Sequence, residues 1–214
     1  MHFNDIRTYP QTGWGNGLIL YEKSDTAIFN LAENGESTKS FISKGLFSKL
    51  INELKEDSYV IISFGNNDEK LEDASRGTSL EEYKKNLLFM AKCIEEAHCK
   101  PIFVTSPTRR FFENGKIIDS HKGYPLAMLE FAKENNYPIV DMNSLTKDYY
   151  NYLGEEETKK LHLYLDKGEY KAFPDGACDN SHYSYHGAVK IAGIFVHALK
   201  EVCPQLYDYF IEEE

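Results

Sequence analysis

Short apolar runs alternate with longer amphipathic stretches along this chain, and that alternation restricts its fold more than any other feature. Residues 59–64 form a nearly continuous apolar run, which is typical of a strand covered on both faces of its sheet. Further strands are expected at residues 26–32, 101–105 and 137–141. Amphipathic periodicity predicts helices at residues 40–54, 81–97, 124–135, 145–153 and 185–202. Strands that alternate with helices indicate a parallel, doubly wound α/β sheet.

The 214 residues fit one domain, since domains average roughly 150 residues. The sequence has no repeats and no Pro/Gly/Ser-rich linker, so we expect a single domain over residues 1–214. No apolar run reaches the roughly 18 residues that a membrane helix requires. The first residues lack the basic and apolar segments of a signal peptide, and the four cysteines form no C-x-x-C pair. These features predict free thiols and a cytoplasmic protein.

The formal net charge of −10 bears on the class of partner. Nucleic-acid binding needs a basic surface, and anionic membranes attract basic segments, so neither partner is expected.

Ligand sites in such sheets lie at the carboxyl ends of the strands, which directs attention to three segments. Gly35 follows the first expected strand and can bring its backbone close to a ligand. Asn67 follows the second strand, where its carboxamide could donate to a developing oxyanion. Asp179 precedes His182 by three residues, a spacing that lets a carboxylate orient an imidazole across one turn. Taken singly, each segment also fits an ordinary turn or helix cap.

A metal site is not expected, and neither is a cofactor. His186 lies one turn beyond His182, and with Asp179 these residues imitate a metal triad. The segment lacks the glutamate of an H-E-x-x-H motif.

Taken together, the segments resemble the SGNH (GDSL-type) hydrolases, in particular the rhamnogalacturonan acetylesterase-like branch. The matching segments occur in the family's order: residues 10–15 (PQTGWG), 34–41 (NGESTKSF), 64–70 (FGNNDEK), 105–110 (TSPTRR) and 175–182 (DGACDNSH). The resemblance implies a flavodoxin-like three-layer α/β/α fold. It also implies hydrolysis of a carboxylic ester, with deacetylation of a carbohydrate as the expected reaction.

The resemblance also implies roles for individual residues. Gly35 matches the glycine whose N–H serves the oxyanion hole, and Asn67 matches the side-chain donor to the same hole. Asp179 and His182 match the acid and the base of the catalytic triad. Asn66 stands where the family usually has histidine.

One departure concerns the nucleophile. The family begins with a strand that ends in Gly-Asp-Ser, and no such motif occurs in this sequence. The sequence therefore predicts a chain that starts after the nucleophile and lacks the first strand, with very weak activity or none. Ser37 imitates the motif but lies in the oxyanion-glycine segment, and Ser63 and Ser181 are poorer substitutes.

Three further residues are weaker candidates for substrate binding. Arg109 and Arg110 follow an expected strand and could reach toward an acidic sugar, or face solvent on a hairpin. Trp14 could stack on a sugar ring or pack in the core. The expected partner is a small-molecule or oligosaccharide ester.

Two rival interpretations remain at this stage. Residues 65–68 also resemble the Gly-Asn-His-Asp/Glu segment of metallophosphoesterases, and Asp119-Ser120-His121 imitates their Asp-x-His, but in the wrong order. Alternatively, the chain is a non-catalytic relative that binds a sugar ester or a partner strand. A missing strand would leave an unpaired sheet edge through which the chain could self-associate.

Overall fold

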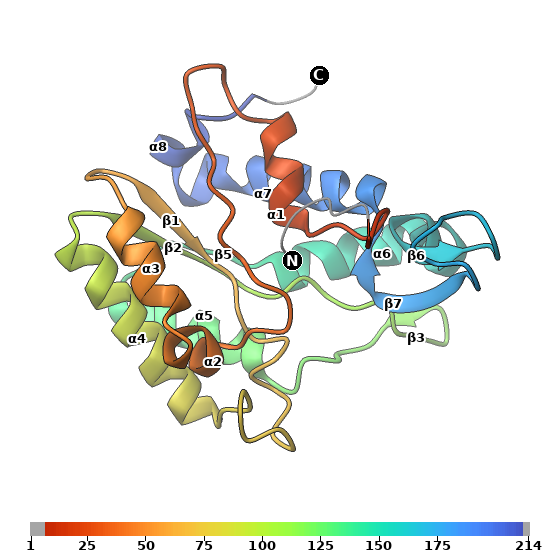
Figure 1. The fold of residues 1–214 in the computed structure, drawn as a ribbon, viewed down its shortest axis with the longest axis horizontal. Helices are drawn as coiled ribbons and strands as arrows, with labels where there is room; N and C mark the ends of the chain where they lie inside the picture. Colours follow the sequence, from red (N-terminus) through yellow and green to blue (C-terminus); the bar gives the residue numbers. More distant parts are fainter. Residues whose placement is uncertain (1–6, 212–214) are drawn as a thin grey trace. The chain divides into compact units, whose positions relative to one another are not determined.

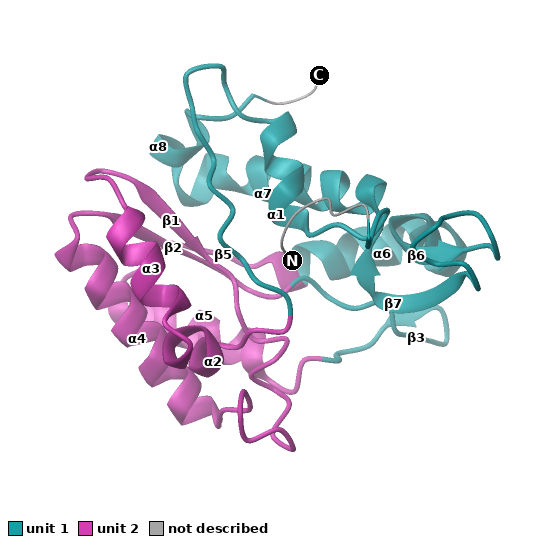
Figure 2. Cartoon of the chain, viewed as in Figure 1, with its two compact units in different colours: residues 1–34, 107–120, 144–214 teal, residues 35–106, 121–143 magenta. Residues whose placement is uncertain are grey.

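The computed structural model describes residues 7–211, whose helices and strands are shown in Figure 1. These residues form two compact units, unit 1 (residues 7–34, 107–120 and 144–211) and unit 2 (residues 35–106 and 121–143), coloured separately in Figure 2. The expected alternation of helices and strands is confirmed, and the chain is an α/β protein with a parallel sheet. A single domain over residues 1–214 stays a prediction.

The parallel sheet lies in unit 2 and has the strand order β1-β2-β5. It contains β1 (Tyr59–Ile62), β2 (Lys100–Val104) and β5 (Ile139–Val140). The central strand, β2, is buried from its second residue onward, as expected of a parallel strand covered on both faces. The three expected strands at these positions are therefore confirmed.

The helices of unit 2 are α2 (Thr38–Ser43), α3 (Leu46–Glu53), α4 (Leu80–Glu96) and α5 (Tyr124–Asn135). Their buried faces join β1 and β2 in one apolar core, in which Leu87 and Met128 are fully buried. The single helix expected over residues 40–54 is wrong: Gly45 adopts φ +75 between α2 and α3. That left-handed conformation suits glycine and ends the first helix.

Unit 1 contains the long helix α7 (Tyr185–Val202), most of the long helix α6 (Met142–Thr158) and several short helices and 3₁₀ turns. The short elements are α1 (Trp14–Gly17), the 3₁₀ turns Leu18–Leu20 and Lys159–Leu161, and α8 (Pro204–Tyr207). Helix α7 has the bounds predicted for the helix at residues 185–202. The helix expected at 145–153 is longer than predicted and is interrupted at Gly154, which has φ +80.

Helix α1 packs closely on α7 within unit 1. A Cβ on Gly17 would lie 2.7 Å from the carbonyl oxygen of Ala188, so only glycine permits this approach. The Trp14 ring lies 5.2 Å from the ring of Phe195, centroid to centroid. This contact joins residues from opposite ends of the chain in one core.

Two antiparallel hairpins in unit 1 are built from strands that were not predicted, although a hairpin at Arg109 and Arg110 was one of the alternatives. They pair β3 (Phe112–Glu113) with β4 (Lys116–Ile117), and β6 (His162–Leu165) with β7 (Ala177–Tyr183). The sequence of β7 is mostly polar and lacks the apolar alternation by which strands are recognised.

The strand expected at residues 26–32 is wrong, because these residues form no strand. Their side chains alternate between partly buried and exposed as a strand's would, and Phe29 is 78% exposed. A strand also requires a hydrogen-bonded neighbour, and the described residues give this segment none. No helix within residues 7–211 is long and apolar enough to cross a membrane.

Candidate active site

A β-bulge in unit 1 brings Asp179 and His182 together. Opposite β6, Tyr183 pairs with His162 and Asp179 pairs with Leu163. Residues 180–182 are therefore extra residues on β7, with no counterpart on β6. In a regular strand, residues three apart point to opposite faces, so the bulge is what allows these two side chains to meet.

Asp179 and His182 form a tightly held acid–base pair. The Nδ1 atom of His182 lies 2.6 Å from Oδ2 of Asp179. The other carboxylate oxygen, Oδ1, accepts hydrogen bonds from the backbone N–H groups of Ser181 (2.6 Å) and His182 (3.0 Å). Burial opposes ionisation of Asp179, but these hydrogen bonds outweigh it and lower the pKa of the carboxyl group. The pairing expected from the spacing is present, although it lies in a bulged strand and not at a helix start.

This geometry suits His182 to act as a base. A carboxylate that accepts a hydrogen bond from Nδ1–H fixes the tautomer in which Nε2 carries the lone pair. The His182 side chain is 48% exposed, so a substrate can reach the ring.

Gly35 and Asn67 lie in unit 2, on two loops that are bound to each other. Gly35 has φ +80 and precedes α2, which Ser37 caps. The Asn67 amide nitrogen, Nδ2, donates to the carbonyl oxygen of Glu36 at 3.0 Å. This bond connects the Asn67 side chain to the residue that follows Gly35.

The orientation of the Asn67 amide is fixed by two neighbours of opposite character. The carbonyl of Glu36 can only accept, and the ammonium of Lys70, 2.9 Å from Oδ1, can only donate. Reversing the amide would break both hydrogen bonds. Nδ2 carries two hydrogens, so one remains to donate to a ligand.

Asp68 braces the same two loops. Its buried carboxylate accepts hydrogen bonds from the backbone N–H and hydroxyl of Thr38 and from the hydroxyl of Thr78. Burial raises the pKa of Asp68, although these hydrogen bonds oppose the rise. Asp68 therefore fixes the start of α2 relative to the loop that carries Asn67.

The three weaker candidates have different surroundings in unit 1. Trp14 is partly buried against Phe195. Arg109 donates from Nη1 to the carbonyl of Ser120 at 2.8 Å. Arg110 is 4% exposed and its guanidinium is hydrogen-bonded to protein groups, so the solvent-facing alternative is wrong for Arg110.

The serines weighed as substitutes for the nucleophile have structural contacts. Ser37 is buried and its hydroxyl accepts from the N–H of Ser40 as the cap of α2. Ser181 is exposed and its N–H bonds to Asp179. Ser63 follows β1 directly and is partly buried.

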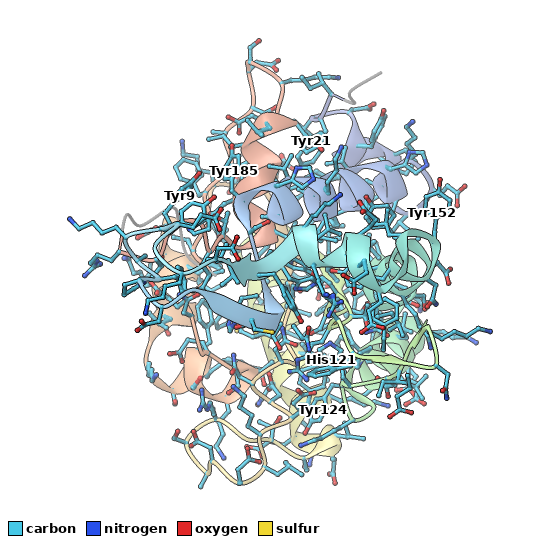
Figure 3. All side chains as sticks on the ribbon, turned by 90° about the vertical axis from the view of Figure 1, so that its right-hand side faces the viewer. Tyr9, Tyr21, His121, Tyr124, Tyr152 and Tyr185 are labelled. Atoms are coloured by element: carbon cyan, nitrogen blue, oxygen red, sulfur yellow. The ribbon has the colours of Figure 1, made fainter. Side chains whose placement is uncertain are left out.

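Unit 2 contains a second His–carboxylate contact, between Glu69 of the segment at residues 64–70 and His121. His121 Nδ1 lies 3.4 Å from Glu69 Oε2, and both side chains are almost fully buried. Figure 3 shows His121 among surrounding side chains, near Tyr124. Across residues 7–211, no three His, Cys, Asp or Glu side chains are close enough to hold a metal ion.

Sequence reasoning missed the residues that hold the candidate groups. The sequence predicts no role for Lys70, and it does not connect Thr38 and Thr78 with Asp68. Asn180 was visible in the segment before α7, but its contact with Arg110 depends on pairing across the chain that no local spacing reveals.

No protein-family model matches the chain. Rhamnogalacturonan acetylesterase RhgT of Bacillus subtilis (strain 168) is 33% identical over 207 residues, which cover 96% of this chain and 88% of that protein. The probable rhamnogalacturonan acetylesterase YesY of the same organism is 25% identical, covering 95% of this chain and 90% of its own length.

Solved structures share the fold. The crystal structure of protein YxiM from Bacillus subtilis superposes with a TM-score of 0.81 at 23% identity, over 98% of this chain. This chain covers 55% of the length of that protein. Axe2, an acetylxylan esterase from Geobacillus stearothermophilus, gives a TM-score of 0.52 at 17% identity, over 77% of this chain and 68% of that one.

The first of these relatives exceeds 30% identity along nearly the whole chain. The fold and the order of the matched segments agree with that likeness. The chain therefore belongs to the SGNH (GDSL-type) esterases, in their rhamnogalacturonan acetylesterase-like branch.

Proposed function

We propose that this chain supplies the acid–base pair and the oxyanion donors of a carbohydrate O-deacetylase that works by acyl transfer to serine. The observation that carries the proposal is the contact between His182 and Asp179, with the carboxylate held by two backbone N–H groups. The relative that is 33% identical is named a rhamnogalacturonan acetylesterase, which supports an acetylated carbohydrate as the substrate.

In this mechanism a serine hydroxyl attacks the ester carbonyl while His182 takes its proton at Nε2. Asp179 holds Nδ1–H and stabilises the imidazolium that forms. The N–H of Gly35 and the second Nδ2 hydrogen of Asn67 donate to the tetrahedral oxyanion. His182 then protonates the leaving alcohol, and water attacks the acetyl-serine with His182 again as base. The products are acetate and the free sugar hydroxyl.

This chain is expected to be inactive or very weak, because its sequence has no match to the family's Gly-Asp-Ser segment. Without a nucleophile, a site can still retain roughly 10³- to 10⁴-fold acceleration over water from its remaining groups. Restoring the segment should therefore raise activity strongly.

The experiment compares this chain with a fusion, called the extended chain, in which a strand that ends in the family's Gly-Asp-Ser segment precedes residue 1. Both are assayed with 4-nitrophenyl acetate and with acetylated rhamnogalacturonan. We expect a gain in kcat of at least about 10³-fold in the extended chain. The gain should disappear when the added serine becomes alanine, and also in His182→Ala. An extended chain that folds but hydrolyses neither ester would contradict the proposal.

A second candidate is a non-catalytic relative that binds a sugar ester or a partner strand. In unit 2, β1 has only β2 as a hydrogen-bonded neighbour among the described residues, so its other edge could accept a strand from a second copy. Calorimetry with an acetylated oligosaccharide tests this candidate. Binding of the oligosaccharide without turnover, in this chain and in the extended chain, would favour this candidate. A dimer that is lost in Ile61→Pro, which places a proline in the edge strand, would also favour it.

A further inference from the structure

The guanidinium of Arg110 is buried in unit 1 with few charged neighbours. Its Nε donates to the hydroxyl of Thr158 (3.1 Å), and Nη1 donates to the hydroxyl of Tyr164 (2.9 Å). Nη2 donates to the backbone carbonyl of Glu155, whose carboxylate is 4.0 Å away and half exposed. The Tyr164 ring lies 4.8 Å from the guanidinium carbon. A buried cation is costly unless its donors are satisfied, so this set of oxygens is a built environment for an arginine.

The same arginine holds Asn180, the first extra residue of the bulge, at two points. The backbone N–H of Arg110 donates to the carbonyl of Asn180 at 2.8 Å. Nη1 of Arg110 donates to the Asn180 side-chain oxygen at 3.0 Å, and the Tyr164 hydroxyl donates to that oxygen as well. The extra residues of a bulge lack partners on the neighbouring strand, so their conformation must be fixed by contacts of this kind.

We propose that Arg110 is a positioning residue for the Asp179–His182 pair. By fixing Asn180, it selects the bulge conformation in which the carboxylate of Asp179 meets Nδ1 of His182. The consequence for catalysis rests on the proposed function, whereas the effect on the pair itself does not.

The planar fork of arginine is essential to this role. Three different nitrogens serve Thr158, Asn180 and the Glu155 carbonyl at once. Lysine keeps the charge but has a single nitrogen, which cannot reach this set of acceptors together. Arg110→Lys therefore removes the geometry and retains the cation.

The test measures the Nδ1–H proton of His182 by NMR in the 214-residue chain, and it does not require turnover. The proton is assigned by its absence in His182→Gln. We expect its exchange with water to be about tenfold faster in Arg110→Lys, and a few-fold faster in Tyr164→Phe, which loses one hydrogen bond to Asn180. Lys159→Met is the matched control. Lys159 lies over the same Tyr164 ring at 5.8 Å, and its ammonium bonds to Glu156, so the exchange rate should not change.

Wild-type exchange in a folded Arg110→Lys chain would overturn the proposal and leave Arg110 a merely structural residue. If that variant does not fold, Tyr164→Phe decides, and unchanged exchange in it would overturn the proposal equally. In the extended chain, Arg110→Lys should lower kcat and leave KM unchanged. If no extended chain hydrolyses esters while exchange still accelerates in Arg110→Lys, the proposed function fails and the positioning role stands.

Discussion

At the scale of single residues, the Asn67 side chain shows how two neighbours can aim a donor. Glu36 accepts from its amide nitrogen and Lys70 donates to its oxygen, so the remaining N–H has a defined direction. Such preorganised donors stabilise an oxyanion without reorganisation during the reaction.

Asn67→Asp replaces that donor with a carboxylate of the same shape. In the extended chain we expect kcat for 4-nitrophenyl acetate to fall by about 10²- to 10³-fold. Asn66→Asp is the matched control, because Asn66 is exposed and adjacent, and it should leave kcat within about twofold. Equal losses in the two variants would show that added charge, and not the lost donor, lowers the rate.

His162 makes the stability of the protein depend on pH. Burial lowers the pKa of its ring to about 4, from an ordinary value of 6.5, and the charge of Arg110 acts in the same direction. As the pH falls from 6.5 to 4, the unfolded chain binds a proton that the native ring does not, so the free energy of unfolding falls. The loss attributable to His162 is on the order of 3 kcal/mol and is complete below about pH 4.

Urea unfolding between pH 7 and 4 checks this expectation. In His162→Gln the decline over this window should be shallower, whereas His98→Asn, at an exposed position, should retain the wild-type slope. Asp179 acts in a lower window. Its lowered pKa contributes stability that is lost only as the pH falls below about 3.8, the ordinary pKa of an aspartate. Asp179 therefore contributes little to the change in unfolding free energy between pH 7 and 4.

At the scale of elements, the start of α7 depends on the absence of one side chain. A Cβ on Gly187 would lie 1.9 Å from the backbone carbonyl oxygen of Leu161, just before β6. Gly187→Ala should therefore displace α7 or β6 and lower the free energy of unfolding by about 3 kcal/mol or more.

Gly15→Ala, in α1, is the matched control for thermal unfolding. Its added Cβ meets only the Asn30 side chain, at an ordinary 3.5 Å, so stability should change by less than about 1 kcal/mol. A Gly187→Ala variant as stable as Gly15→Ala would disprove the close contact.

The elements also show what local sequence patterns can and cannot predict. The helices α4, α5 and α7 were predicted nearly to the residue because their apolar period, caps and flanking turns agree. Residues 26–32 have a strand's period, yet strand formation depends on a neighbour that no local pattern supplies. Strand β7 is the converse case: its residues are polar, and only pairing with β6 defines it.

The same distinction applies to the candidate site. The spacing of Asp179 and His182 predicted their contact, because a pair three residues apart needs only a local turn to meet. The bulge and the contact of Arg110 with Asn180 depend on pairing between distant segments, which no local pattern reveals. Lys70 is three residues from Asn67, so the same spacing argument could have predicted their contact.

At the scale of the whole molecule, each unit has its own set of buried apolar side chains. Ile94 is fully buried in unit 2, and Ile191 is fully buried in unit 1. Ile94→Val and Ile191→Val should each lower the free energy of unfolding by about 0.5 to 1.5 kcal/mol.

The combined variant tests whether the two cores are independent. Because these residues belong to different units, the two losses should add within about 0.5 kcal/mol. Ile62→Val with Ile94→Val, both in the core of unit 2, is the comparison pair and should deviate more from additivity. Both pairs are measured by denaturant unfolding. A larger departure from additivity for Ile94→Val with Ile191→Val than for Ile62→Val with Ile94→Val would count against the division into two units.

The contact between Gly17 and Ala188 has a consequence for the moment of synthesis on the ribosome. Unit 2 has all its residues once position 143 has emerged, but α1 must wait for α7, the last long helix to be made. Synthesis proceeds at ~5–20 residues per second, so the time between the synthesis of α1 and that of α7 is on the order of ten seconds or more. During this time the apolar side chains of Trp14 and Leu18 have no α7 to pack against. They are exposed on the nascent chain, where a chaperone or another nascent chain can bind them.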